Sequence, residues 1–196
     1  MLTIPAFGTR ESGLAFVKRH SQWLEEQMKK VKARQSEAHS CKIGTLVLLH
    51  GEPTPIRLDT SLETPRICVG QTPICDWPGE GHDLQPLIET GLWQIACDSL
   101  PLRVAQLNAV AALPVKRVTV RNQRSRWGSC SRRGTISLNW RLIQVPPFVR
   151  DYIIIHELTH LRHMNHSDCF WQDVDRACPG WKSAETWLRQ NSRLLK

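Results

Sequence analysis

The chain has 196 residues, of which 41% are hydrophobic, and a formal net charge of +8 at pH 7. This length is enough for a sizeable core in one or two domains, and the even composition excludes a fibrous or disordered chain. Its longest apolar stretches, such as 45–49 and 152–155, are far too short for a membrane span, and no apolar leader opens the sequence. We therefore expect a cytoplasmic protein that has no membrane partner. The seven cysteines include no CxxC pair and predict reduced thiols.

The first 80 residues predict a helix followed by a β-rich subdomain. Apolar residues recur at near-helical spacing across 11–34. Short β-branched runs at 42–58 and 65–70 are separated by Gly and Pro and predict strands. Segment 71–86 is rich in Gly and Pro, which favours a loop or linker between this subdomain and the next.

A second domain is predicted over residues 86–196. Its first segment, 84–113, has a mostly helical pattern that Gly91 and Pro101 should interrupt. Residues 115–121 and 134–140 then alternate apolar and polar side chains, which is typical of half-buried strands. The whole pattern predicts an α+β fold.

A helix that is apolar on nearly all sides is predicted to follow Pro146 and Pro147, over residues 148–161. Such a helix lies in the core, where charged or metal-binding groups are costly unless they are satisfied. This helix nevertheless carries "HELTH" at 156–160. His156 and His160 are four residues apart, so their imidazoles can reach one Zn²⁺ ion. Glu157 then lies close enough to reach a metal-bound water without being a ligand.

A catalytic zinc site usually has a third protein ligand. We expect it to be His166, because a chain that turns back after His160 brings that residue to the metal. Asn165 tolerates the left-handed conformation that such a turn requires. His163 would then contact substrate or support a ligand. The other candidates for the third ligand are Glu185, Asp173 and Asp175.

The sequence resembles the YgjP-like metallopeptidases, which are related to the WLM and SprT zinc peptidases. The resemblance is carried by four segments: "RWGSCS" (126–131), "GTISLNWRLI" (134–143), "DYIIIHELTHL" (151–161) and "NHSDCFW" (165–171). It implies a zincin-like domain in which a small twisted β-sheet packs on a buried active-site helix. It also implies that His156, His160 and His166 bind zinc and that Glu157 is the catalytic base.

These residues predict a zinc-dependent metallopeptidase that acts on protein or peptide substrates. Arg126, Tyr152 and His163 are candidates for stabilising the oxyanion. The substrate is expected along the hairpin formed by "RWGSC" and "GTISLNW", where Gly128 lets a peptide backbone approach closely.

A basic window extends from Ser99 to Arg150, with ten Lys and Arg residues and no Asp or Glu. Such a surface attracts acidic polypeptides, nucleic acid or other polyanions, although it also occurs as a solvated face without a partner. Two alternative functions therefore stay open. One is a zinc-dependent nucleotide pyrophosphatase, and the other is a basic nucleic-acid-binding module with a zinc ion.

Overall fold

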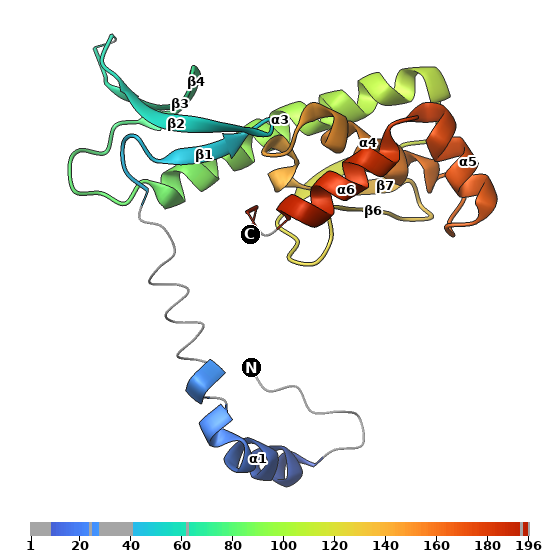
Figure 1. Cartoon of the computed structure of the whole chain (residues 1–196), viewed down its shortest axis with the longest axis horizontal. Coiled ribbons are helices and arrows are strands. Elements are labelled where there is room, and N and C mark those ends of the chain that lie inside the picture. Colours follow the sequence, from blue (N-terminus) through green and yellow to red (C-terminus); the bar gives the residue numbers. More distant parts are fainter. Residues whose placement is uncertain (1–8, 24, 28–40, 62, 193, 196) are drawn as a thin grey trace. The chain divides into compact units, whose positions relative to one another are not determined.

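The computed structural model describes residues 9–23, 25–27, 41–61, 63–192 and 194–195. The chain divides into two compact units, Met1–Ser40 and Cys41–Lys196. In the first unit, helix α1 (Arg10–Arg19) ends in a turn at His20, and residues 21–23 and 25–27 are again helical (Figure 1). The helix predicted over 11–34 is thus interrupted at His20, and Leu24 and residues 28–34 lie outside the described residues. No described helix is both long and apolar enough to cross a membrane.

The second unit begins with a four-stranded antiparallel sheet, in which strands follow each other in chain order (Figure 1). The strands are β1 (Leu46–Leu49), β2 (Glu52–Asp59), β3 (Arg66–Val69) and β4 (Thr72–Asp76). The loop predicted over 71–86 was wrong for its first part, because β4 lies there. Pro73 is tolerated because β4 is an edge strand and its pairing with β3 is irregular at this point. A proline, which has no backbone N–H, disturbs an edge strand less than a central one.

Helix α3 (Gln85–Ala111) follows and is continuous, so the predicted interruptions at Gly91 and Pro101 are wrong. Its buried residues recur every four positions, from Ile88 to Val104, and this packing outweighs the hydrogen bond lost at Pro101. Gly91 serves the packing itself, because a Cβ there would overlap the side chain of Ile74 on β4. The glycine lets α3 lie close to the sheet.

The second sheet has three strands in the order β5-β7-β6. β5 (Arg117–Arg121) is parallel to β7 (Thr135–Asn139), and β6 (Gly128–Cys130) pairs antiparallel with β7. Both predicted strands and the predicted hairpin are therefore present, and β6 forms an edge of the sheet.

The remaining elements are helical. A 3-10 helix, η1 (Trp140–Ile143), leads into α4 (Pro147–Thr159), which is followed by α5 (Asp168–Ala177) and α6 (Trp181–Asn191). α4 packs on α3, α5, α6 and β6, and Val149, Tyr152 and Ile154 are buried. The predicted combination of helices and sheets is confirmed, with one antiparallel and one mixed sheet. The zincin-like arrangement stays a prediction.

One hydrophobic core extends through the unit Cys41–Lys196. It includes Ile56 and Val69 of the first sheet, Leu92 of α3, Leu138 of β7 and Ile154 of α4, all essentially inaccessible to solvent. The domain division predicted at 1–80 and 86–196 stays a prediction.

Asp151 on α4 binds two arginines, Arg103 on α3 and its own neighbour Arg150, and the contact with Arg103 connects the two helices. Arg103 donates to both carboxylate oxygens of Asp151, at 3.0 and 2.7 Å, and Arg150 donates to one of them at 3.0 Å. Burial alone would raise the pKa of Asp151, but the two guanidinium groups outweigh it and lower that pKa. The ionised carboxylate is therefore the form that stabilises the fold.

We expect Asp151→Asn to lower the free energy of unfolding by about 1–2 kcal/mol near pH 7. A folded pKa below the unfolded value of about 3.9 stabilises the fold above that value and loses this effect as the pH falls through the folded pKa. The difference between variant and wild type should therefore shrink below about pH 4 in urea titrations. Asp98→Asn, on an exposed helix face, is the control. A difference that stays constant down to about pH 2 would contradict this role.

Candidate metal centre

The C-terminal half of α4 carries His156 and Glu157. Pro146 and Pro147 set the start of the helix, and many of the residues that follow are apolar and buried. His156 and Glu157 lie in its last two turns, and His160 caps its C-terminal end with its N–H bonded to the C=O of His156. The two histidines therefore lie one turn apart on the same face, as the sequence predicts.

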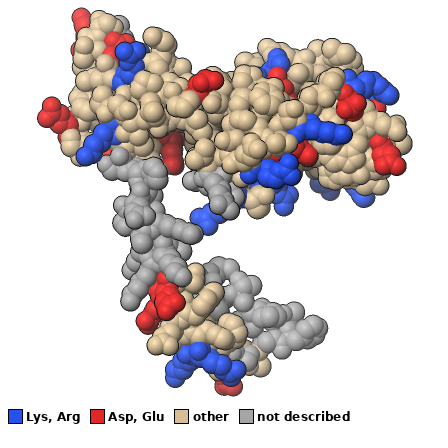
Figure 2. All heavy atoms as spheres, in the orientation of Figure 1, with Lys and Arg blue, Asp and Glu red and all other residues tan. Residues whose placement is uncertain are grey.

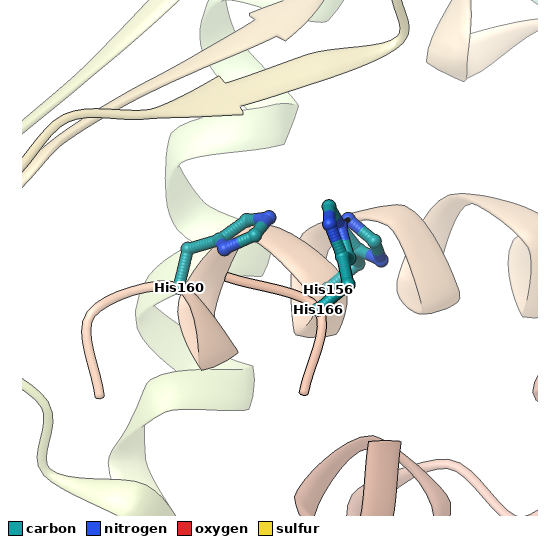
Figure 3. Close-up of side chains that lie close together, drawn as sticks. All are labelled: His156, His160 and His166. Atoms are coloured by element: carbon teal, nitrogen blue, oxygen red, sulfur yellow. Dashed lines mark hydrogen bonds between the residues drawn. The ribbon is translucent and has the colours of Figure 1, made fainter. Parts of the chain in front are cut away.

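The three predicted histidine ligands lie together. Ligand nitrogens of His156, His160 and His166 all lie within 4.8 Å of one another. The Nε2 atoms of His156 and His166 are 3.1 Å apart. Figure 3 shows His156 and His160 on α4, with His166 on the segment that follows it and the rings turned towards one another. One metal ion could contact all three.

The turn that returns His166 to α4 differs from the prediction. Leu161 and Arg162 donate to the C=O groups of Leu158 and Thr159, three residues earlier, so the helix tightens before the chain leaves it. Between His160 and His166 no residue has a positive φ. The left-handed conformation predicted for Asn165 is therefore absent, and a tightened helix end replaces it.

The protonation of the imidazoles suits a metal ion. Nδ1 of His160 lies 3.0 Å from the C=O of His163, which places a proton on Nδ1 and a lone pair on Nε2. Burial, followed by the neighbouring His160 and His166, lowers the pKa of His156 to about 4. His156 is thus neutral at neutral pH, as metal binding requires. Its Nδ1 is buried and has no hydrogen-bond partner in the part of the chain that the structure describes.

Glu157 is the acidic side chain nearest this cluster in sequence and is only 5% exposed. Burial raises its pKa to about 7, although the positive charge of Arg126 opposes the change. Its Oε2 atom is buried and has no hydrogen-bond partner among the described residues. The carboxylate can therefore exchange a proton near neutral pH.

Gly128 on β6 packs directly against Glu157. A Cβ at Gly128 would lie 2.6 Å from Oε1 and 2.7 Å from Cγ of Glu157. The structure thus gives a reason for glycine at this position that the sequence did not predict, namely the Glu157 side chain, while the close approach of a substrate backbone stays a prediction. Gly128 sets how near β6 can lie to α4.

Tyr152 is buried, and its hydroxyl donates to Oε1 of Glu185 at 2.9 Å. Its ring lies edge-on to His156, with centroids 5.9 Å apart. Burial, together with Glu185, raises the pKa of Tyr152 strongly, so the phenol stays neutral. Glu185, one alternative third ligand, is in contact with this hydroxyl and not with the histidine cluster.

The other alternative ligands are also engaged elsewhere. Asp173 lies 3.0 Å from Nε2 of His163 and accepts from Arg176, while Asp175 accepts from the indole N–H of Trp181. The hydrogen bond from His163 lowers the pKa of Asp173. His163 therefore orients α5 and, through its backbone C=O, His160.

Phe170 was not predicted as a site residue. It is completely buried, and its ring centroid lies 4.7–5.0 Å from the centroids of all three histidines. Trp171 stacks on His166 at 5.7 Å and on Trp181 at 4.6 Å. Phe170 and Val174 are an apolar pair at i and i+4 after Ser167, and this spacing predicts a helix with a buried face. The spacing does not predict that Phe170 packs against the three imidazoles.

The basic window divides into two groups of residues. Arg103 and Arg150 make ion pairs, both with Asp151. The other eight make no ion pair with a carboxylate among the described residues: Lys116, Arg117, Arg121, Arg124, Arg126, Arg132, Arg133 and Arg141. Figure 2 shows Lys and Arg side chains along the lower edge of the second unit, where Figure 1 places β6 and the segment before it.

Comparison with known proteins gives one family match and one structural neighbour of note. The family model described as YgjP-like, metallopeptidase domain, matches residues 1–191. The chain is also similar to the crystal structure of the metallopeptidase zymogen of Pyrococcus abyssi abylysin, with 27% identity, over 50% of this chain and 96% of that chain, at a TM-score of 0.42. No curated protein matches. The family model thus covers nearly the whole sequence.

The contact between Gly128 and Glu157 can be tested by a double-mutant cycle. Gly128→Ala adds a methyl group where the Glu157 side chain lies, so we expect it to lower the free energy of unfolding by about 1–3 kcal/mol. In a Glu157→Ala background the same change should cost much less, because the three atoms nearest to the new methyl all belong to Glu157. Gly180→Ala, which meets open space, is the control. Equal costs in both backgrounds would show that the contact does not hold β6 in place.

Proposed function

The chain belongs to the YgjP-like metallopeptidase family, and on this premise we propose that it is a zinc-dependent peptidase that uses Glu157 as its catalytic base. The family implies a metal ion. The observation that carries the proposal is the convergence of His156, His160 and His166 beside a buried carboxylate. The alternatives have less support, because the sequence has no Gly-rich phosphate-binding loop for a nucleotide and a nucleic-acid-binding module with structural zinc needs no catalytic base.

We assign the metal to His156, His160 and His166. Three imidazoles suit zinc, and they leave a coordination position for a reactant. When bound there, zinc acts as a Lewis acid that lowers the pKa of water and polarises a peptide carbonyl. Phe170 lies against all three rings and restricts their rotation.

Glu157 accepts the proton of the attacking water in this proposal and passes it to the leaving amine. Its raised pKa, about 7, matches a group that must take up and release a proton near neutral pH. Gly128 on one side and α4 on the other leave the carboxylate little freedom, and Oε2 has no competing partner among the described residues. The base is therefore held in position before substrate binds.

The substrate backbone is placed along β6 in this proposal. The C=O of Trp127 accepts from the N–H of Asn139, and the N–H of Ser131 donates to the C=O of Thr135. The backbone N–H and C=O groups of the odd-numbered residues 127, 129 and 131 therefore point towards β7. In an antiparallel ladder the intervening residues direct their N–H and C=O groups to the opposite side. Gly128 and Cys130 thus offer hydrogen bonds at the open edge to an added strand.

For the oxyanion we favour Arg126 over Tyr152 and His163. The Tyr152 hydroxyl is already bonded to Glu185, and His163 is bonded to Asp173. Arg126 is exposed, makes no ion pair with a carboxylate among the described residues, and has an electrostatic effect on Glu157. The cytoplasmic location and the zincin-like fold remain further parts of the proposal.

The ligand assignment predicts different zinc contents for two histidine variants. His166→Ala leaves only two imidazoles and should lose zinc during dialysis against a weak chelator, whereas His163→Ala should retain about one ion per chain. Metal content by mass spectrometry, with circular dichroism as a folding check, measures both. Full zinc occupancy in the His166→Ala protein, or loss of zinc from a folded His163→Ala protein, would contradict the ligand assignment.

Glu157→Gln should keep zinc and fold but lower hydrolysis of casein by at least about 10³-fold, because the amide cannot accept a proton from water. Glu185→Gln removes a carboxylate that also lies near α4 and bonds Tyr152, so it is the matched control and should retain most of the activity. Casein hydrolysis by Glu157→Gln within about tenfold of wild type would rule out this mechanism.

A further inference from the structure

A cavity of about 470 Å³ lies beside β6 and is lined by three arginines, Arg124, Arg126 and Arg141. The segment 122–127, residues Asn139, Ser192 and Leu195 complete its lining. No Asp or Glu lines it, and none of its arginines makes an ion pair with a carboxylate among the described residues. This arginine pocket therefore concentrates positive charge in a concave site, where an anion has several donors within reach.

The pocket is built around one buried side chain. Asn139, which is 4% exposed, donates from Nδ2 to the C=O groups of Gln123 and Arg126, at 2.7 and 3.1 Å. Its Oδ1 accepts from the backbone N–H of Arg141 at 3.1 Å. A single amide thus fixes both the segment that carries Arg124 and Arg126 and the start of η1, where Arg141 lies.

Arg141 is held in place further by its own side chain. Its Nη1 donates to Oδ1 of Asn122 at 2.6 Å, and its guanidinium lies 4.6 Å from the ring centroid of Trp140. These contacts use one N–H donor and one face of the Arg141 guanidinium. The other N–H groups of this guanidinium are left for a ligand. The charge is therefore positioned before any ligand binds.

The pocket adjoins the proposed catalytic site. Trp127 lines it, and the next residue, Gly128, contacts Glu157 and begins β6. Arg126 lies near enough to affect Glu157 electrostatically. A peptide that extends along β6 would therefore carry one of its side chains over the arginines.

The position of the pocket favours a peptide over nucleic acid. Trp127 lines the pocket and directly precedes β6, an edge strand whose open side can pair with an extended peptide backbone. The indole of Trp127 adds an apolar wall suited to the methylene groups of a glutamate.

We propose that the arginine pocket is a specificity subsite that binds an acidic side chain of the peptide substrate, on one side of the bond to be cleaved. The proposal rests on the proposed peptidase function for its biological meaning. The binding itself requires no hydrolysis, so the two can fail separately.

The test measures binding by fluorescence anisotropy to the full chain carrying Glu157→Gln, which prevents cleavage. The probes are two labelled peptides of equal length, one with central glutamates and the other with glutamines at those positions. We expect the glutamate peptide to bind about tenfold more tightly. Arg124→Gln with Arg141→Gln should remove this preference, and Arg124→Lys with Arg141→Lys should restore part of it.

Arg117→Gln with Arg121→Gln is the matched control. It removes two charges of the same basic window from β5, at the opposite edge of the sheet, and neither residue lines the pocket. The preference should survive there. Arg124→Gln alone, at an exposed position, should lower the preference for the glutamate peptide about threefold. This single variant keeps the test valid if the double variant with Arg141→Gln does not fold.

Three outcomes would overturn the subsite. The first is equal binding of both peptides to the host chain. The second is an equal loss of preference in the pocket variant and the β5 control, which would indicate only a general basic field. The third is salt-sensitive binding of a labelled oligothymidylate that the pocket variant abolishes while neither peptide binds, which would make the pocket a phosphate site. Retained peptide preference without casein hydrolysis by wild type would instead count against the peptidase function alone.

Discussion

The contact of Gly128 with Glu157 fixes the separation between β6 and α4, and the rest of the site depends on it. α4 is buried by apolar side chains, so it cannot shift without disturbing the core. β6 can approach its polar face only because one residue lacks a side chain. The same packing helps to bury the carboxylate, and burial raises the pKa of Glu157 to about 7. The position and the acidity of Glu157 thus have a common origin.

Much of the candidate site could be predicted from the sequence because the residues concerned are local. His156 and His160 share one helical repeat, and the return of His166 needs only a short turn. The geometry of that turn could not be predicted. The chain turns through a tightened end of α4 and not through a left-handed conformation at Asn165. Nor could the place of Phe170, which depends on how α5 docks against α4.

The fold was predictable where local pattern and tertiary packing agree. The strand 134–140 and the helix after Pro147 have clear periodicity, and both exist. Gly91 and Pro101 have low helix propensity, yet a face buried from Ile88 to Val104 holds α3 together. Strand β4 forms despite Pro73, because an edge strand tolerates a proline. In each case a contact distant in sequence decided against the local preference.

We propose that three imidazoles hold one metal ion beside Glu157, and anomalous diffraction from zinc-soaked crystals at the zinc edge can locate that ion. We expect one strong peak about 2.0–2.1 Å from Nε2 of His156, His160 and His166, with no Glu157 oxygen at that distance. A peak bound by Glu157 or Glu185 in place of His166, or zinc bound only elsewhere on the chain, would contradict it.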